Sequence, residues 1–272
     1  MVRRPTPRPP VPLAAWTDAE AALQHAVGTL QTGGEEAVHD ARVATRRLEA
    51  LVELLRPRGT RRQARAAQRR LRELRRTLGG ARDAEVALGV LTRLARESQP
   101  RVTLRLAPAR AALQRKVRAA RHAAAAGCTG PAQRLTRALA RFATASQGRL
   151  GERWPRRLAG LAEQVTRAAQ RAAHHRDLAA LHRLRIRFKR LRYALEAAHT
   201  LGWRPLSDDD LHALRTVQDA LGRTLDAQAA APILAEVARG TPLARLAAAS
   251  ARRDTAALAT AVAQWLKPRR RP

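Results

Sequence analysis

The stretch AVHDARVATRRLEALVELL, residues 37–55, decides the fold, because it has the pattern of an amphipathic helix with a basic stripe. With 100° of rotation per residue, His39, Arg42 and Arg46 fall within an arc of about 60°. The opposite side of this helix is apolar and holds Ala41, Leu48, Leu51, Val52 and Leu55. We therefore expect the apolar side to pack on a core and the basic stripe to face away from it.

The same pattern occurs a second time in the chain. Residues 181–198, LHRLRIRFKRLRYALEAA, align with residues 38–55 at an offset of 143. Residues 214–234, LRTVQDALGRTLDAQAAAPIL, align with residues 71–91, LRELRRTLGGARDAEVALGVL, at the same offset. Because two independent segments share one offset, the sequence predicts an internal duplication.

The second copy of the stripe repeats the basic residues of the first. Its members are His182, Arg185, Lys189 and Arg192, and Leu184, Leu191 and Leu195 form the apolar side. Each stripe spans about 10 Å between its first and third members, which would suit several anionic groups in line. Arg47 and Arg190 lie at the flanks of the two stripes. In the first half, the helix expected to follow residues 37–55 carries a comparable row of arginines, namely Arg61, Arg62, Arg65, Arg69, Arg72 and Arg76.

The composition of the whole chain indicates an all-α fold. Ala, Leu, Arg and Glu dominate, aromatic residues make up only 3%, and runs of β-branched residues are missing. We predict a first half over about residues 13–130, a connecting segment over 131–155 and a second half over 156–266. Residues 1–12 and 267–272 are Pro/Arg-rich or basic tails, of which the first is expected to be disordered.

Capping and helix-breaking residues set the expected helix ends in the first half. Thr17 and Glu20 form a capping box, which predicts a helix that begins at about residue 18. The helices are expected over about 18–30, from about 35 to near 57, and over 61–78, 81–97 and 107–126, followed by a turn at 127–131 and another helix to about 146.

The charge of the chain indicates a polyanionic partner. The formal net charge is +31, and the two tails supply only a small part of it. All but three of the 53 basic residues are arginines. Arginine forks bond phosphate oxygens in pairs and stay charged when half-buried.

The number of cysteines and the lack of long apolar segments indicate where the protein resides and whether it forms disulfides. Cys128 is the sole cysteine, so neither a disulfide framework nor a thiolate metal cluster is expected. No signal peptide and no apolar run of transmembrane length is visible. We expect a soluble, cytoplasmic protein that needs no metal and no cofactor.

Several candidates have an ordinary structural explanation. For His39 and His182, a structural role stays as plausible as a ligand contact. Asp83 and Asp226 follow Leu-Gly breaks, where the favoured interpretation is a stabilising charge in the first turn of a helix, and the alternative is pairing with an arginine of the site. The acidic run at 207–210 is interpreted as an N-cap with an acidic first turn rather than as a metal site.

With these motifs in place, the sequence resembles the CHAD domain, an α-helical family named for its histidines. VHDARVATRRL at 38–48 and LHRLRIRFKRLRYALE at 181–196 carry the resemblance, supported by LGGARDAEV and LGRTLDAQ, and it covers about residues 13–266. It implies two helical bundles related by pseudo-twofold symmetry, with the basic stripes lining a central channel. The activity that it implies is binding of inorganic polyphosphate, which would place the protein with polyphosphate granules.

The candidate site combines the duplicated stripes with the neighbouring arginine row. It comprises His39, Arg42, Arg46, Arg47, Arg65, Arg69, Arg72, Arg76, His182, Arg185, Lys189, Arg190 and Arg192. Glu49 departs from the pattern, because the second copy has Arg192 at that position. An acid there would repel phosphate, or would instead pin Arg46 or Arg42.

Three rival functions remain for so basic a chain. General nucleic-acid binding is the main one, since counterion release favours any polyanion; against it, aromatic platforms are scattered and asparagine is absent. Phosphoryl-transfer catalysis would need metal-binding carboxylates or a Gly-rich phosphate loop, and the sequence has neither, so no enzyme is expected. Membrane binding ranks last, because the apolar faces are committed to bundle cores. Polymer length, biological purpose and oligomeric state stay open.

Overall fold

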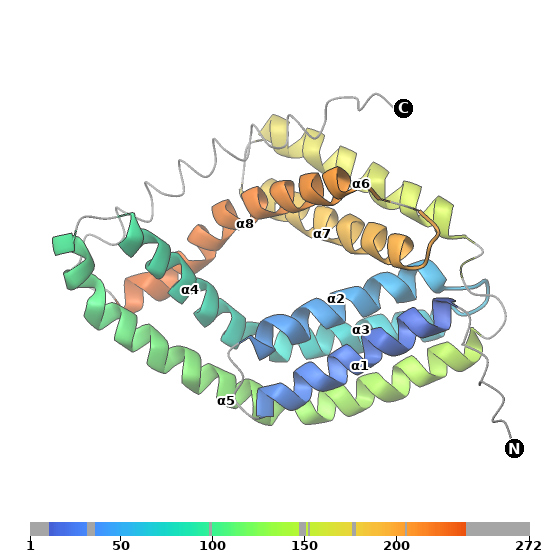
Figure 1. Cartoon of the computed structure of the whole chain (residues 1–272), viewed down its shortest axis with the longest axis horizontal. Coiled ribbons are helices and arrows are strands. Elements are labelled where there is room, and N and C mark those ends of the chain that lie inside the picture. Colours follow the sequence, from blue (N-terminus) through green and yellow to red (C-terminus); the bar gives the residue numbers. More distant parts are fainter. Residues whose placement is uncertain are drawn as a thin grey trace, which may run out of the picture.

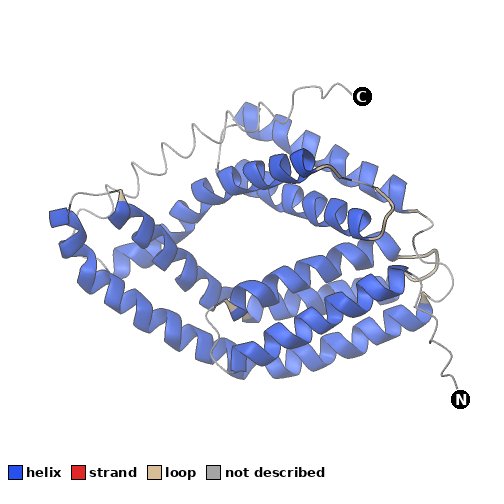
Figure 2. Cartoon of the chain, viewed as in Figure 1, coloured by secondary structure: helices blue, strands red, loops and turns tan. Residues whose placement is uncertain are grey.

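The computed structural model describes residues 11–31, 36–97, 100–146, 151, 153–175, 178–204 and 206–237. Within these ranges the chain forms α-helices and no β-strand, so the all-α prediction is confirmed (Figure 2). The helices are α1 (Val11–Gln31), α2 (Ala37–Leu55), α3 (Arg61–Thr77), α4 (Gly79–Arg96), α5 (Pro100–Ala145), α6 (Trp154–His175), α7 (Leu178–Thr200) and α8 (Asp208–Val237). Residues 1–10 and 238–272 lie outside the described ranges, so the C-terminal tail and the end of the predicted second half are not described, whereas residues 11 and 12 of the predicted N-terminal tail belong to α1.

The helices are arranged as a flattened ring (Figure 1). On one side lie α2, α3 and α4, with α1 and the long α5 outside them, and on the other side lie α6, α7 and α8. The ring closes where α2 contacts α7 and where α4 contacts α8. Helices α2 and α7, which the sequence pairs at offset 143, therefore lie next to each other; the duplication itself stays a prediction from the sequence.

Buried side chains form clusters on both sides of the ring. One cluster joins α1, α2, α3 and the second half of α5, and another joins α6, α7 and the first half of α8. A further cluster joins α4, the first half of α5 and the end of α8. This third cluster connects the two sides, which the sequence did not predict.

Helix α2 forms where the sequence predicts it. Its expected apolar side is buried, with Ala41, Leu48 and Val52 fully enclosed, because this side packs against α1 and α3. The basic stripe faces away from this core and toward α7.

Helix α1 begins earlier than its predicted capping box. It starts at Val11, so Thr17 lies inside the helix and is not an N-cap. Proline is tolerated in the first turn, so Pro12 does not stop the helix. Trp16 is buried against Phe142, with ring centroids 5.5 Å apart, and this packing favours helix before Thr17.

The predicted turn at 127–131 is wrong, because α5 runs through it without a break. Ala124, Cys128 and Leu135 are buried in the core shared with α1, α2 and α3, and they follow helical spacing. Burial of this stripe outweighs the hydrogen bond that Pro131 cannot donate to Gly127. Residues 131–145, predicted to connect the halves, thus belong to α5 (Figure 1), where interior prolines are an ordinary cause of bending.

The start of α8 confirms the interpretation of the acidic run. The backbone N–H of Asp210 donates to Ser207 Oγ at 3.1 Å, and the backbone N–H of Ser207 donates back to Asp210 Oδ2 at 3.3 Å. This reciprocal pair is a capping box. Among the described residues, no helix is long and apolar enough to cross a membrane.

Candidate functional site

A cleft of about 570 Å³ lies between α2, α4, α7 and α8. Its walls are Val43, Val86, Ala179, Ile186, Tyr193, Leu225, Gln228 and Ala229 together with charged and imidazole side chains. The latter are His39, Arg42, Arg46, Arg82, Asp83, His182, Arg185, Lys189 and Asp226. The cations of the cleft thus outnumber its two carboxylates.

The cleft brings together six of the candidate site residues that the sequence predicts. His39, Arg42 and Arg46 enter it from α2, and their counterparts His182, Arg185 and Lys189 enter it from α7. This follows from the contact of α2 with α7, which turns the two basic stripes toward a common space. Both histidines are exposed at the surface of the cleft.

Arg42 is held in place by the neighbouring helix. Its Nη1 donates to the backbone carbonyl oxygen of Arg75 at 3.0 Å. Burial, with the nearby charges of Arg46 and Arg82, lowers the pKa of Arg42. Arg42 is therefore a positioned cation that loses part of its hydration before any ligand arrives.

The sequence suggested that Glu49 would repel phosphate or would pin Arg46 or Arg42, but the structure pairs it with another arginine. Its Oε2 lies 2.9 Å from Nη2 of Arg75, and both side chains are nearly buried. It therefore pins Arg75 rather than Arg42 or Arg46. Burial lowers the pKa of Arg75 to about 10, an effect that Glu49 opposes and that Arg46 and Arg42 reinforce.

Asp226 does not lie in the first turn of a helix, so the favoured sequence interpretation is wrong for it. Helix α8 begins 18 residues earlier, at Asp208, and Asp226 Oδ1 lies 2.7 Å from Nη2 of Arg185. Asp83 also lies beyond the first turn of α4, and its exposed side chain lines the cleft. The alternative, an acid paired with a site arginine, is the correct one for Asp226.

Lys189 is the most strongly perturbed cation of the cleft. Burial lowers its pKa to about 7, reinforced by Arg185 and Arg46 and opposed by Asp226. Within the described ranges, the structure gives the side chains of Lys189 and Arg46 no carboxylate partner. Burial and the neighbouring arginines thus disfavour the charged form of Lys189 in the ligand-free cleft.

The remaining predicted residues lie outside the cleft. Arg47 is exposed on α2, and Arg190 lines a smaller hollow between α2, α6 and α7. Arg192 pairs with Glu196 at 3.0 Å and lies 4.5 Å from the centre of the Tyr193 ring.

The arginine row on α3 is also separate from the cleft. Arg65, Arg69, Arg72 and Arg76 are exposed, because the opposite side of α3 is buried in the core through Ala64, Ala67, Leu71 and Leu74. The expectation that this row joins the stripes is thus not met in the structure. Of its members, Arg61 and Arg65 line another hollow, at the turn between α2 and α3.

Sequence reasoning missed Arg82 and Tyr193 as lining residues of the cleft. Arg82 lies on α4, and the duplication gave no signal for it because the matching position in the second copy is Leu225. Tyr193 is buried and offers no exposed ring. Among the described residues, no group of three or more His, Cys, Asp or Glu side chains could hold a metal ion.

The helical ring and the cleft identify the class of protein. A family model of the CHAD domain matches residues 14–235, and the chain belongs to this family. The structure is similar to the crystal structure of the CHAD domain from the plant Ricinus communis, with 26% identity and a TM-score of 0.63 over 94% of this chain and 86% of that one. It is also similar in fold to PptA from Streptomyces chartreusis, with 20% identity and a TM-score of 0.62 over 94% and 97% of the two chains. A comparison with curated proteins gave no match.

Proposed function

We propose that the chain binds inorganic polyphosphate in the cleft and catalyses no reaction on it. One observation carries the proposal: Arg46 and Lys189 reach the cleft from two different helices, and neither has a carboxylate partner in the described structure. A linear anion with closely spaced charges would give both cations a partner. Membership of the CHAD family supports this choice of ligand.

Binding would be electrostatic and would use a preformed frame. Arg42 and Arg185 are already fixed, by the Arg75 carbonyl and by Asp226 respectively. Arginine forks bond phosphate oxygens in pairs, so a fixed fork loses little conformational freedom when a phosphate arrives. The mutual repulsion of the cleft cations would be relieved by the ligand, which should therefore stabilise the fold.

Nucleic acid is the weaker candidate for this cleft. Single strands usually gain affinity by stacking bases on exposed aromatic rings, whereas Tyr193, the one aromatic residue of the cleft lining, is 7% exposed. The half-buried positions of Arg42 and Lys189 favour a slim chain that can enter between the helices. We place the protein in the cytoplasm with polyphosphate granules; storage, regulation of turnover and scaffolding are all compatible with such binding.

The test is a competition titration with matched variants. Labelled long-chain polyphosphate is bound at fixed near-physiological salt and challenged with duplex DNA and single-stranded RNA, because salt sets the non-specific background. We expect polyphosphate to stay bound in the presence of a large excess of either nucleic acid. The variant Arg46→Gln/Lys189→Gln should bind polyphosphate far more weakly than Arg137→Gln/Arg141→Gln, which removes two exposed charges from α5. Equal losses in the two variants, or displacement by nucleic acid at equal charge concentration, would refute the proposal.

A further inference from the structure

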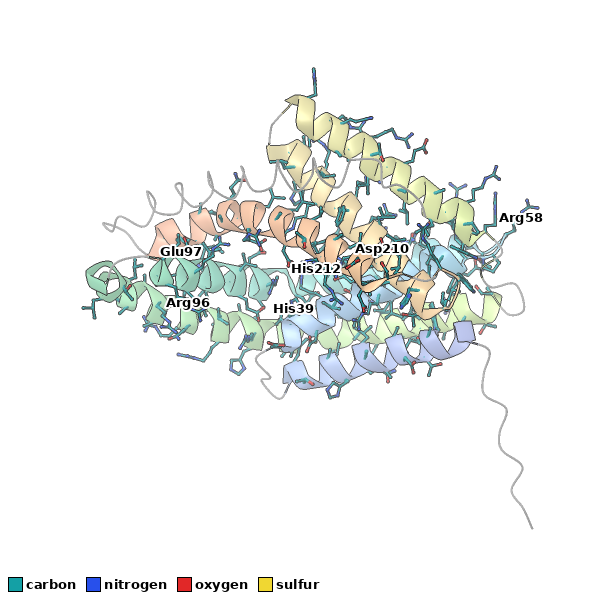
Figure 3. All side chains as sticks on the ribbon, turned by 45° about the horizontal axis from the view of Figure 1, so that its top comes forward. His39, Arg58, Arg96, Glu97, Asp210 and His212 are labelled. Atoms are coloured by element: carbon teal, nitrogen blue, oxygen red, sulfur yellow. The ribbon has the colours of Figure 1, made fainter. Side chains whose placement is uncertain are left out.

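A second arginine-lined hollow lies at the other end of α2, where the chain turns into α3 and meets the start of α6. Its volume is about 400 Å³. The lining residues are Arg56, Pro57, Arg58, Gly59, Arg61, Arg65, Gln68, Arg153 and Arg157. Six of these are arginines and none is an acid. Figure 3 shows Arg58 at the periphery, far along α2 from His39 at the cleft.

The hollow has a fixed backbone frame. Gly59 has φ of +83°, which lets the chain reverse between α2 and α3. Thr60 Oγ1 donates to the Pro57 carbonyl at 3.1 Å and closes the turn. From α6, Nη1 of Arg157 donates to the last carbonyls of α2, those of Glu53 at 2.9 Å and Leu54 at 3.1 Å.

The charge of the hollow is poorly balanced. Arg56 lies 3.7 Å from Glu53, which also accepts a hydrogen bond from Gln68. For the other cations of the rim, Arg58, Arg61, Arg65 and Arg153, the described structure gives no carboxylate partner. Burial, reinforced by Arg56 and Arg153, lowers the pKa of Arg157.

Another arginine-bearing hollow, beside α4, differs in this respect. There Glu85 pairs with Arg82 at 3.5 Å and with Arg121 at 3.0 Å. The Glu85 carboxylate thus already provides a counter-charge to Arg82 and Arg121. In the hollow at the α2–α3 turn, by contrast, a bound anion would give counter-charges to arginines that have no carboxylate partner among the described residues.

A smaller hollow lies along α2 between this hollow and the cleft. The small hollow between them is lined by Arg46, which also belongs to the cleft, and by Arg190. Its two acids are matched, Glu49 by Arg75 and Glu53 by Arg56 and Gln68. From Arg46 to Arg56 the rise along the helix is about 15 Å.

We propose that the hollow at the α2–α3 turn is a second phosphate-binding site, which takes an outlying stretch of the polyphosphate chain held in the cleft. The inference rests on the proposed function. A chain too short to leave the cleft gains nothing from the hollow, whereas a long chain passes Arg46 and Arg190 and gains contacts with Arg58, Arg61 and Arg153. The hollow therefore gives the protein a preference for long polymers.

The experiment compares two probes, long-chain polyphosphate and tripolyphosphate, at one salt concentration. The hollow variant is Arg58→Gln/Arg61→Gln/Arg153→Gln, and the control is Arg137→Gln/Arg141→Gln/Arg171→Gln, whose three residues are exposed on α5 and α6. We expect the Kd for the long chain to rise about tenfold in the hollow variant, the order expected for three surface charge contacts, with an unchanged Kd for tripolyphosphate. The salt dependence of long-chain binding should also become shallower in that variant.

An unchanged long-chain Kd, or a loss no larger than that of the control, overturns the inference. Equal weakening of both probes also overturns it, because a general loss of charge then explains the result. The cleft is tested separately with Arg46→Gln/Lys189→Gln, which should weaken both probes. If that variant binds both like the wild type while the hollow variant still loses the long chain, the proposed function of the cleft fails and the hollow stands as a polyphosphate site by itself. Unchanged melting temperatures of all variants show that the fold is intact.

Discussion

Arg185 and Asp226 form an ion pair, with 2.7 Å between Nη2 and Oδ1, inside a cleft whose other charges are mostly positive. The pair joins α7 to α8 and fixes the direction of the guanidinium. It also places a negative charge beside the proposed path of an anion. Asp226 thus stabilises the empty cleft and opposes the ligand.

Replacement of Asp226 separates these two effects. Asp226→Asn should lower the free energy of unfolding by about 1 kcal/mol, because Arg185 loses its partner in a half-buried position. The same change should raise polyphosphate affinity several-fold, since the cleft loses an opposing charge. Thermal melting with and without polyphosphate measures both effects. A variant that loses stability and affinity together would show that orientation of Arg185 matters more than the repulsion.

Lys189 should make binding depend on pH. Its pKa is lowered from 10.5 to about 7 in the free protein, with Arg185, Arg46, Arg42 and Asp226 as the surrounding charges. A bound anion favours the protonated amine, so binding takes up a proton at pH above about 7. Affinity should therefore fall as pH rises from about 7, by about tenfold per unit at most.

Calorimetry in two buffers of different ionisation enthalpy counts this proton uptake. Lys189→Arg keeps the charge and should remove most of the uptake, because arginine stays protonated throughout this range. If uptake persists in Lys189→Arg, it arises at another group, and Lys189 is not the source of the pH dependence.

The stability of the ligand-free protein should change with pH in the opposite direction to the affinity for polyphosphate. Between about pH 7 and 10.5 the unfolded chain holds a proton on Lys189 that the native protein has largely lost. The contribution of Lys189 to the free energy of unfolding of the ligand-free protein should thus rise with pH across this window. Urea titrations of wild type and Lys189→Met at pH 7 and pH 9 measure it, and a smaller pH dependence is expected in the variant.

The pair of Glu49 and Arg75 should matter for stability more than an exposed pair. Glu49→Gln leaves the nearly buried Arg75 without a counter-charge, and we expect a loss of about 1–3 kcal/mol. Glu163→Gln breaks a pair with Arg167 at 3.3 Å that is largely exposed, and it should cost little. Urea denaturation of the two variants makes the comparison, and similar losses would contradict the role given to Glu49.

The sequence was sufficient for the parts of the fold that depend on local periodicity. Helix α2 forms where its apolar side predicts it, and the N-cap with an acidic first turn forms at 207–210 as predicted. The stripes of α2 and α7 meet because both helices expose the side opposite their apolar residues. Helix positions, caps and exposed faces depend on residues that are close in the sequence, so they can be predicted without a structure.

Three of the failures involve contacts between residues that are distant in the sequence. Pro131 marks a turn locally, but burial of Cys128 and Leu135 keeps α5 helical. The partner of Asp226 is Arg185, on another helix, and no spacing rule links them. The arginines of α3 match the stripes in composition and still lie elsewhere, because the direction of a helix face is set by packing.

Two glycines with positive φ offer a matched test of the junction between the halves. Gly59 has φ of +83° with open space where a Cβ would lie, and Gly151 has φ of +84° with the Trp203 ring in that space. The backbone N–H of Gly151 donates to the carbonyl of Leu55 at 3.2 Å, and Trp203 stacks on Trp154 with ring centroids 5.5 Å apart. Gly59→Ala should cost only the strain of the left-handed backbone, about 1 kcal/mol.

Gly151→Ala should cost distinctly more than Gly59→Ala, because the added methyl group must also displace the Trp203 ring from its stack. Trp203→Leu removes part of that obstruction, so in this background the extra cost of Gly151→Ala over Gly59→Ala should shrink. A double-mutant cycle by urea denaturation measures the coupling between positions 151 and 203. A coupling near zero would show that Trp203 moves aside freely and that backbone strain alone selects glycine at both positions.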